Sequence, residues 1–285
     1  MVGLGAALSF GAAAAALDAI GMPDTVDKYV ERGAAMWAAT GIGGGALTLG
    51  ARKLVVAGSL GSALRWLALI VFVGQCIGAL LMGRVSFVLA TLDAQMSNLD
   101  SPKRSRPQLA SRLSLFTLLS WAFLHMSVFI PLIYIPGYAS TQLANSSALS
   151  GASHLSIICF ALSIGALIPI SSRLPQMVAN LAPRALLTLS LWCLWLPAAD
   201  SWAMSYAFCA VFGLALGATA VQRQDGNISL VLVLLCAAAV LIGVPIGGWL
   251  FVAVGSGEYY LPTITFSAAA SLLAALAWAV GQKMR

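Results

Sequence analysis

Long apolar blocks follow one another along this 285-residue chain, separated by short polar links. A helix needs about 20 mostly apolar residues to cross a bilayer, and nine blocks reach that length. We therefore predict an all-α membrane protein with nine transmembrane helices. The predicted spans are Val2–Ile20, Ala34–Ala57, Ser62–Gly83, Leu113–Ile135, Ser153–Ser172, Pro183–Ala199, Trp202–Val221, Ser229–Val252 and Leu261–Gly281.

Composition excludes a large soluble domain. Charged residues make up 8% of the chain and hydrophobic residues 60%, whereas a soluble domain carries about 25% charged residues. Too few polar groups remain to cover a water-exposed surface. The chain is expected to be an integral, multi-pass protein of the plasma membrane or an internal membrane, with the lipid bilayer as its main partner.

The most polar stretch, Asp100–Arg112, contains four of the fifteen basic residues and two prolines. A basic segment broken by prolines between apolar blocks is typical of a cytoplasmic loop. It divides the chain into three predicted parts. Residues 1–84 form part of an N-terminal helical bundle of three helices, 85–112 form a central cytoplasmic basic loop, and 113–285 form a C-terminal six-helix bundle.

Basic residues also predict the orientation. Threading nine spans puts twelve of the fifteen on one side, and only Arg52, Lys53 and Arg65 on or toward the other. Because cytoplasmic loops carry the excess of Lys and Arg, the C-terminus is predicted to be cytoplasmic and the N-terminus outside. Topology thus accounts for the net charge of +6, and no nucleic-acid partner is expected. The twelve are Lys28, Arg32, Arg84, Lys103, Arg104, Arg106, Arg112, Arg173, Arg184, Arg223, Lys283 and Arg285.

No motif of a soluble enzyme occurs: HExxH, GxSxG and P-loop patterns are all missing from the sequence. The five cysteines lie inside apolar blocks without CxxC spacing, as buried thiols do. We therefore predict no enzyme activity, no cofactor and no metal site.

Several short segments, in order along the chain, resemble the monocarboxylate-porter branch of the major facilitator superfamily, especially its fungal members. Ile130–Ala139 is similar to the end of the family's seventh helix, and Gly243–Gly248 to its eleventh. The other matching segments are Gly3–Phe10 (fourth helix), Tyr29–Arg32 with Ala34–Gly45 (fifth), Gly61–Arg65 (sixth), Phe212–Ala218 (tenth) and Phe266–Ala268 (twelfth).

The resemblance implies that the nine helices correspond to helices four to twelve of a two-bundle transporter, so that the first three helices have no counterpart here. It implies transport of a small organic anion (a monocarboxylate) or a fungal metabolite, with protons as the coupling ion. One departure concerns the eighth helix, where the family carries Gly-Arg before a proline. This chain has Gly165-Ala166 before Pro169, and its nearest arginine, Arg173, comes later.

The candidate substrate-binding residues are ionisable or polar groups within spans, where such groups are costly and often functional. Arg52 and Lys53 interrupt the second predicted span, and either an interfacial position or one facing a cavity is open to them. His125 lies in the middle of its span, where it either bonds to a neighbouring helix or couples protons. Tyr134 lies in the segment that resembles the seventh helix.

Three hypotheses follow. The first is a secondary transporter of a small organic anion or metabolite, and the second is a truncated transporter that no longer functions. The third is a non-transporting scaffold or an intramembrane biosynthetic protein derived from a transporter. The third would need polar residues gathered around a cavity, and only Arg52, Lys53 and His125 are candidates for that role.

Overall fold

The computed structural model describes residues 26–57, 65, 69, 115–141, 150–171, 176–197, 201–221, 230–254 and 260–283. The chain divides into two units. Unit 1 comprises Met1–Pro23, Leu54–Leu113 and Gly226–Ser229, and unit 2 comprises Asp24–Lys53, Ser114–Asp225 and Leu230–Arg285. Nearly all described residues belong to unit 2.

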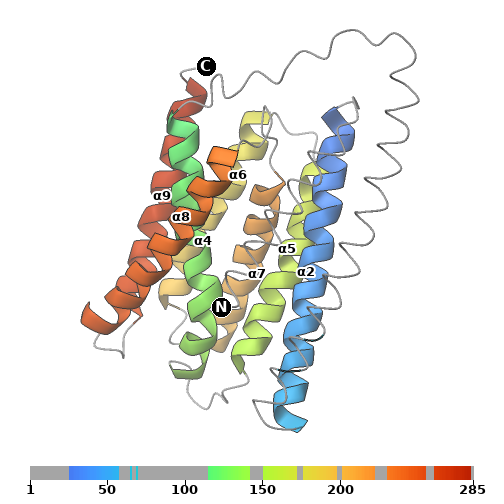
Figure 1. The fold of residues 1–285 in the computed structure, drawn as a ribbon, viewed down its shortest axis with the longest axis vertical. Helices are drawn as coiled ribbons and strands as arrows, with labels where there is room; N and C mark the ends of the chain where they lie inside the picture. Colours follow the sequence, from blue (N-terminus) through green and yellow to red (C-terminus); the bar gives the residue numbers. More distant parts are fainter. Residues whose placement is uncertain are drawn as a thin grey trace. The chain divides into compact units, whose positions relative to one another are not determined.

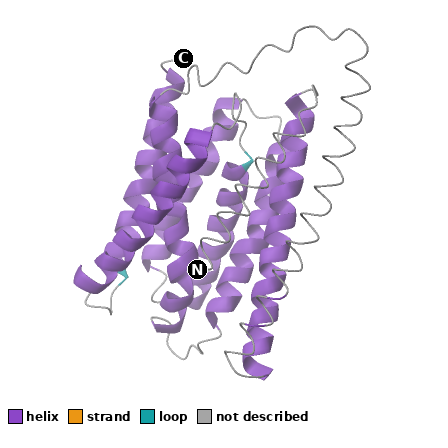
Figure 2. Ribbon diagram, viewed as in Figure 1, coloured by secondary structure: helices purple, strands orange, loops and turns teal. Residues whose placement is uncertain are grey.

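The described residues are helical and include no strand (Figures 1 and 2). Two helices end in a π-helical turn, η1 after α6 and η3 after α8. The elements are α2 (Val26–Ala57), α4 (Leu115–Thr141), α5 (Ser150–Ser171), α6 (Gln176–Leu189), η1 (Ser190–Trp195), α7 (Trp202–Ala220), α8 (Leu230–Trp249), η3 (Leu250–Val254) and α9 (Leu261–Lys283).

Six of the described helical stretches are long and apolar enough to cross a membrane. They are Leu115–Ala139, Gly151–Ile168, Val178–Trp195, Trp202–Ala220, Leu234–Val254 and Leu261–Lys283. The prediction of an all-α, multi-pass membrane protein is therefore confirmed, whereas the described residues do not show nine spanning helices. The predicted span Val2–Ile20, and Ser62–Gly83 apart from residues 65 and 69, lie outside them, as does the basic loop Asp100–Arg112. The three predicted parts of the chain and the orientation of its termini stay predictions.

One predicted boundary is wrong at the start of α2. Helix α2 begins at Val26 rather than Ala34, so Lys28 and Arg32 belong to a helix and not to a link. Asp27 near the positive end of the helix dipole favours this earlier start. Despite its 32 residues, α2 is not among the six spanning stretches, and its sequence contains both charged residues and many glycines.

Prolines misled the prediction at two other boundaries. Helix α6 begins at Gln176, and Pro183 lies inside it rather than at its start. Helix α4 continues through Pro131 and Pro136 to Thr141, whereas the predicted span ended at Ile135. A helix within a membrane tolerates proline, because its neighbours and local adjustments can satisfy the freed carbonyl groups.

Helix α9 packs against three other helices, α4, α6 and α8. Three hydroxyl groups spaced four residues apart on α9 bond to one neighbour each. Thr263 Oγ1 donates to the carbonyl of Gly247 (2.9 Å), and Ser267 Oγ to that of Ser127 (2.9 Å). Ser271 Oγ lies 2.9 Å from Thr188 Oγ1. This hydroxyl stripe ties α8, α4 and α6 to one helix, α9.

Glycines bring α5 and α7 into backbone contact, and this pair packs more extensively than any other in unit 2. A Cβ atom added at Gly213 would collide with the carbonyl of Ile158, and one at Gly217 with that of Leu162. Gly165 of α5 approaches the carbonyl of Leu214 in the same way. Only glycine permits so close an approach, so these positions set the spacing of the two helices.

Replacing the hydroxyl stripe tests its contribution to stability. The combined variant Thr263→Val, Ser267→Ala, Ser271→Ala should unfold more easily by about 2 kcal/mol, because each hydrogen bond between membrane helices is worth roughly 0.6 kcal/mol. Unfolding of the detergent-solubilised protein by sodium dodecyl sulfate measures this change. Thr265→Val is the matched control, since Thr265 Oγ1 bonds within α9, to Leu261 and Pro262. Equal stability of the triple variant and the control would contradict the assignment.

Candidate functional site

His125 lies on α4 and bonds to its own helix, not to a neighbouring one as sequence analysis considered. Its Nδ1 is 2.8 Å from the carbonyl oxygen of Trp121, one turn earlier. A carbonyl only accepts, so Nδ1 carries a proton and donates this hydrogen bond. Nε2 is then the ring nitrogen at which a proton can be gained or lost.

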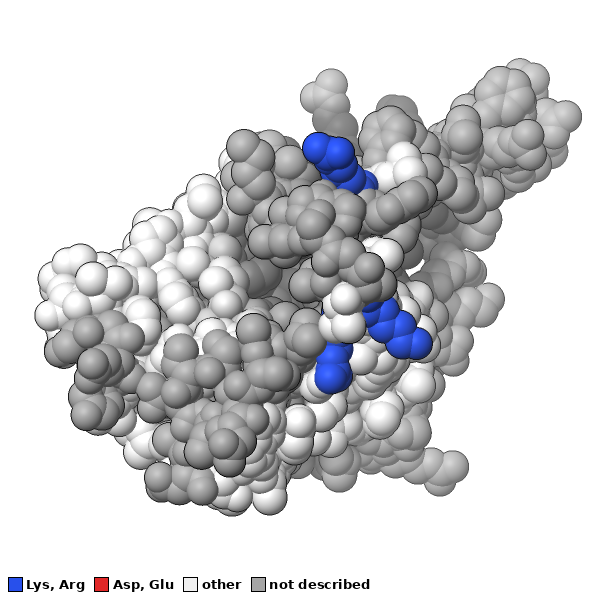
Figure 3. Space-filling view, turned by 90° about the horizontal axis from the view of Figure 1, so that it is seen from below, with Lys and Arg blue, Asp and Glu red and all other residues white. Residues whose placement is uncertain are grey.

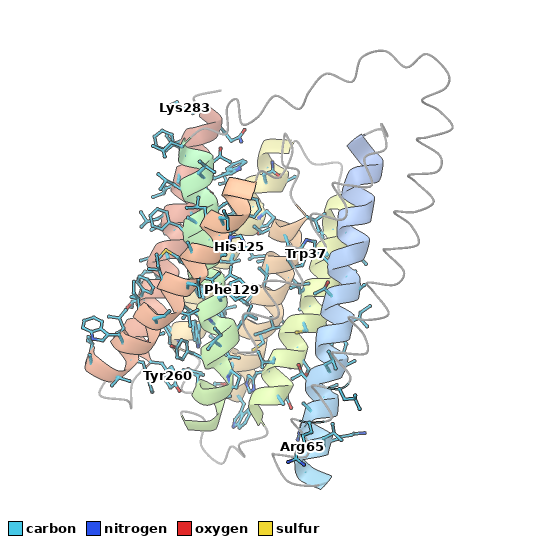
Figure 4. All side chains as sticks on the ribbon, in the orientation of Figure 1. Trp37, Arg65, His125, Phe129, Tyr260 and Lys283 are labelled. Atoms are coloured by element: carbon cyan, nitrogen blue, oxygen red, sulfur yellow. The ribbon has the colours of Figure 1, made fainter. Side chains whose placement is uncertain are left out.

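An aromatic stripe runs along α4 on either side of this histidine. The Trp121 and His125 ring centroids are 5.7 Å apart, and those of His125 and Phe129 are 6.4 Å apart. Figure 4 shows His125 and Phe129 together on this helix. Spacing of four residues places all three rings on one side of α4.

Arg184 of α6 lies against the other end of the stripe. Its Cζ atom is 5.8 Å from the centre of the Trp121 ring and 5.0 Å from that of the Trp278 ring of α9. Its Nη1 donates to the carbonyl of Asn180 (3.1 Å), and only 2% of the residue is exposed. Two indole faces thus stabilise a buried cation.

From the sequence, Arg184 was expected at the cytoplasmic end of its span, at the second position of the helix; the structure instead has it buried inside α6, and the side of the membrane stays a prediction. Because α6 starts at Gln176, Arg184 lies a little over two turns inside the helix. Its partners come from α4 and α9, which are distant in the sequence. Nothing in the sequence around Trp121 or Trp278 indicates that both indole rings contact the same guanidinium group.

Tyr134 faces away from His125, although both lie on α4. Nine residues separate them, which is about two and a half turns. The Tyr134 hydroxyl donates to the carbonyl of Val244 on α8 (3.1 Å). A Cβ added at Gly248 would lie 2.6 Å from the same hydroxyl oxygen, so this glycine leaves room for the tyrosine.

Arg52 and Lys53 differ in their surroundings. Arg52 is half-buried, and its Nη1 donates to Ser153 Oγ of α5 at 2.7 Å, whereas Lys53 is exposed. Both lie just before the last turn of α2, which ends at Ala57. Figure 3, seen from the end where α2 finishes, colours basic side chains only and no acidic one among the described residues.

His154 was not a candidate from the sequence, where it looked isolated at the start of a span. It is fully buried, and its ring stacks on Tyr206 of α7 with centroids 4.6 Å apart at 18°. Trp202 adds a second ring at 5.8 Å. The spacing of Trp202 and Tyr206, one turn apart, marks an aromatic face on α7, but nothing in the sequence links that face to His154.

The structure does not gather the predicted site residues into one site, but it joins His125 to a residue that was not a candidate. His125 and Arg184 both contact Trp121, which makes one mixed site of a cation, an imidazole and indole faces. Tyr134 lies on the opposite side of α4 from His125. Arg52 contacts Ser153 at the start of α5, whereas Gly165, which approaches α7, lies nearer the end of that helix. None of the protein-family models, curated proteins or solved structures compared with this chain matches it.

Removing the Arg184 guanidinium should destabilise the docking of α6. Arg184→Met keeps most of the side-chain volume but loses two desolvated cation–π contacts, so we expect a loss of about 1–3 kcal/mol. Intrinsic tryptophan fluorescence during unfolding in detergent reports the change. Lys283→Met is the control, because Lys283 is exposed. If Arg184→Met is as stable as the native chain, the two indoles do not stabilise this cation.

Proposed function

We propose that this chain is a secondary transporter of the monocarboxylate-porter type within the major facilitator superfamily, carrying a small organic anion or metabolite together with protons. The observation that carries the proposal is the reciprocal packing of two three-helix sets, α4–α5–α6 and α7–α8–α9. Transporters of this superfamily are built from three-helix repeats of inverted topology.

The packing is reciprocal in part when the helices are matched in order, α4 with α7, α5 with α8, and α6 with α9; the contacts of α4 with α5 and of α8 with α9 have no counterpart of similar extent among the described helices. Helix α4 packs on α8 and α9, and correspondingly α7 packs on α5 and α6. Because α6 and α9 are matched with each other, exchanging the two sets leaves the contact between them unchanged. Such a pattern is expected when two copies of one three-helix unit form a bundle.

The matched helices also run in opposite directions. Gly213 and Gly217 of α7 lie against Ile158 and Leu162 of α5, so those two helices are parallel. Helix α8 is parallel to α4 by similar contacts, Gly243 against Met126 and Gly248 against Tyr134. Consecutive α4 and α5 are antiparallel, with Gly151 against Pro136. Because α7 is parallel to α5, it is antiparallel to its match α4, and for the same reason α8 is antiparallel to its match α5.

Helix α9 completes the pattern, because it runs antiparallel to α6. Arg184 of α6 contacts Trp278, and Thr188, one turn later, contacts Ser271. All three matched pairs, α4 with α7, α5 with α8 and α6 with α9, are therefore inverted. This is the relationship between inverted-topology repeats in secondary transporters.

In the proposed plan the six described spans are helices seven to twelve, and α2 is the fifth. The complete arrangement is the nine-helix one expected from the sequence, with a central cytoplasmic loop, an external N-terminus and a cytoplasmic C-terminus. His125 is the proposed proton carrier, because its Nε2 can gain or lose a proton within a span. Arg52 and Lys53 supply positive charge that attracts the anion at the other end of unit 2.

Reconstituted proteoliposomes test this function directly. Radiolabelled lactate and pyruvate are the probes, with and without an inward gradient of one pH unit. Coupling to one proton should drive accumulation up to about tenfold, because one pH unit corresponds to about 1.4 kcal/mol. His125→Ala should abolish this accumulation while exchange at equal pH persists.

The control for His125→Ala is Lys283→Ala, which changes an exposed residue at the end of α9. If the pH gradient still drives accumulation by the His125→Ala variant, the histidine takes no part in proton coupling. Complete lack of flux for a panel of carboxylates and neutral metabolites, by a folded and reconstituted chain, would count against transport itself and favour a scaffold or biosynthetic role.

A further inference from the structure

Helix α2 lies along α5 in the antiparallel direction. Trp37, early in α2, packs with Ala166 near the end of α5. At the other end, Arg52 of α2 donates a hydrogen bond to Ser153 in the first turn of α5. The contact therefore extends over several turns of both helices, and a cation lies at one end of it.

One side of this contact carries exposed apolar side chains. In the middle of the contact, a Cβ added at Gly41 would collide with Ser163 Oγ, so these two positions face each other. The next residue on each helix, Ile42 and Ile164, is 56% and 61% exposed. One residue is a rotation of about 100° around a helix. Because the two helices are antiparallel, this rotation carries both isoleucines to the same side of the contact.

Two further apolar residues extend this side toward Arg52. Leu49 follows Ile42 by two turns on α2, and Phe160 precedes Ile164 by one turn on α5, so they share the face of these isoleucines. Both are exposed. We call the set Ile42, Leu49, Phe160 and Ile164 the α2–α5 apolar flank.

The α2–α5 apolar flank is about as long as one leaflet of a bilayer is thick. Ile164 follows Ser153 by eleven residues, which is about 16 Å at 1.5 Å per residue. Half of the hydrocarbon core of a bilayer is about 15 Å. The spanning stretch of α5 begins at Gly151, so Ser153 lies at the edge of that core. An acyl chain on the flank would therefore place its headgroup beside Ser153.

Arg52 and Ser153 offer hydrogen-bond donors at this end. A guanidinium carries five N–H donors, and the only described partner of the half-buried Arg52 is Ser153 Oγ at 2.7 Å. Ser153 Oγ accepts that bond, so its own O–H can donate to another oxygen atom. Two donating groups therefore lie side by side where the α2–α5 apolar flank ends.

Charge complementarity selects an anion for these donors. Lys53, which follows Arg52, is exposed and adds a second positive charge. Figure 3 colours no acidic side chain among the described residues. A guanidinium matches the geometry of phosphate oxygens with paired hydrogen bonds. A phosphodiester carries one negative charge, so one net positive charge would remain to attract an organic anion as proposed above.

We propose that this side of the α2–α5 contact binds one phospholipid. Arg52 and Ser153 hold the phosphate of its headgroup, Lys53 adds positive charge, and the α2–α5 apolar flank holds one acyl chain. A soluble phosphate or carboxylate would use the polar end alone, so the length of the apolar flank favours a lipid. The inference goes beyond the proposed function and does not rest on it.

Native mass spectrometry of the full chain in detergent tests the proposal by counting bound lipids. The probes are phosphatidylglycerol, a diacylglycerol with the same acyl chains but no phosphate, and glycerol phosphate, which has no acyl chain. We expect one phosphatidylglycerol per chain to be retained at a concentration at which neither of the other two is.

Variants of the polar end locate the site. Arg52→Ala should lower the affinity for phosphatidylglycerol about tenfold, the effect of losing one charge-assisted hydrogen bond. Ser153→Ala should act in the same direction, because it removes the neighbouring donor. Lys283→Ala is the matched control, since it removes one exposed positive charge from the end of α9 and should leave the affinity unchanged.

A variant of the α2–α5 apolar flank tests the contact with the acyl chain. Ile164→Asn should lower the affinity for phosphatidylglycerol roughly fivefold, because the chain would then meet a polar amide. Leu241→Asn is the control, since Leu241 lies on α8 and is 63% exposed, much like Ile164. It should bind the lipid as the native chain does.

Three results would overturn the proposal. Equal retention of diacylglycerol would mean that the phosphate is not recognised. If glycerol phosphate binds as tightly as the lipid, the polar end takes a soluble anion and the flank holds no chain. Equal weakening by Arg52→Ala and Lys283→Ala would reduce the binding to general attraction between a basic protein and an anionic lipid. Because no transported substrate is present, none of these results decides the transport function.

Discussion

Within a bilayer, helices gain nothing from burying apolar surface against each other, because lipid tails are equally apolar. Backbone groups are satisfied inside each helix, so adhesion between helices must come from close packing and from hydroxyl groups. Unit 2 uses both. Thr263, Ser267 and Ser271 bind α9 to three neighbours, and glycines set α5 against α7.

The buried Arg184 illustrates how such a frame accommodates a charge. An arginine inside a span is expensive, by about 2.5–3.5 kcal/mol at mid-helix on insertion scales. Trp121 and Trp278 offset part of that cost by presenting ring faces from α4 and α9. The same Trp121 accepts, through its carbonyl, the hydrogen bond that orients His125. A change at Arg184 is therefore expected to alter the surroundings of His125, the proposed proton carrier, because Trp121 contacts both residues.

Helix α5 contacts a neighbouring helix on each of two faces. Toward α7 it offers its backbone to glycines, and the bundle of six helices depends on that contact. Toward α2 it offers Cys159, Phe160 and Ser163 to a run of glycines, with Arg52 bonded at the end. On both faces of α5, glycines let a neighbouring helix approach its backbone closely.

The sequence by itself determined the class of the protein, because few charges and long apolar blocks permit only a membrane-embedded helical chain. Trp202–Val221 was predicted almost to the residue, since polar links flank that span on both sides. Prolines and early charged residues misled the boundaries of α2, α4 and α6, because local rules for helix ends are weaker than packing within a bundle. Only the tertiary structure decided the surroundings of the polar groups. Arg184 meets two tryptophans and His154 meets Tyr206 through contacts between helices, and no local pattern in the sequence encodes those distances.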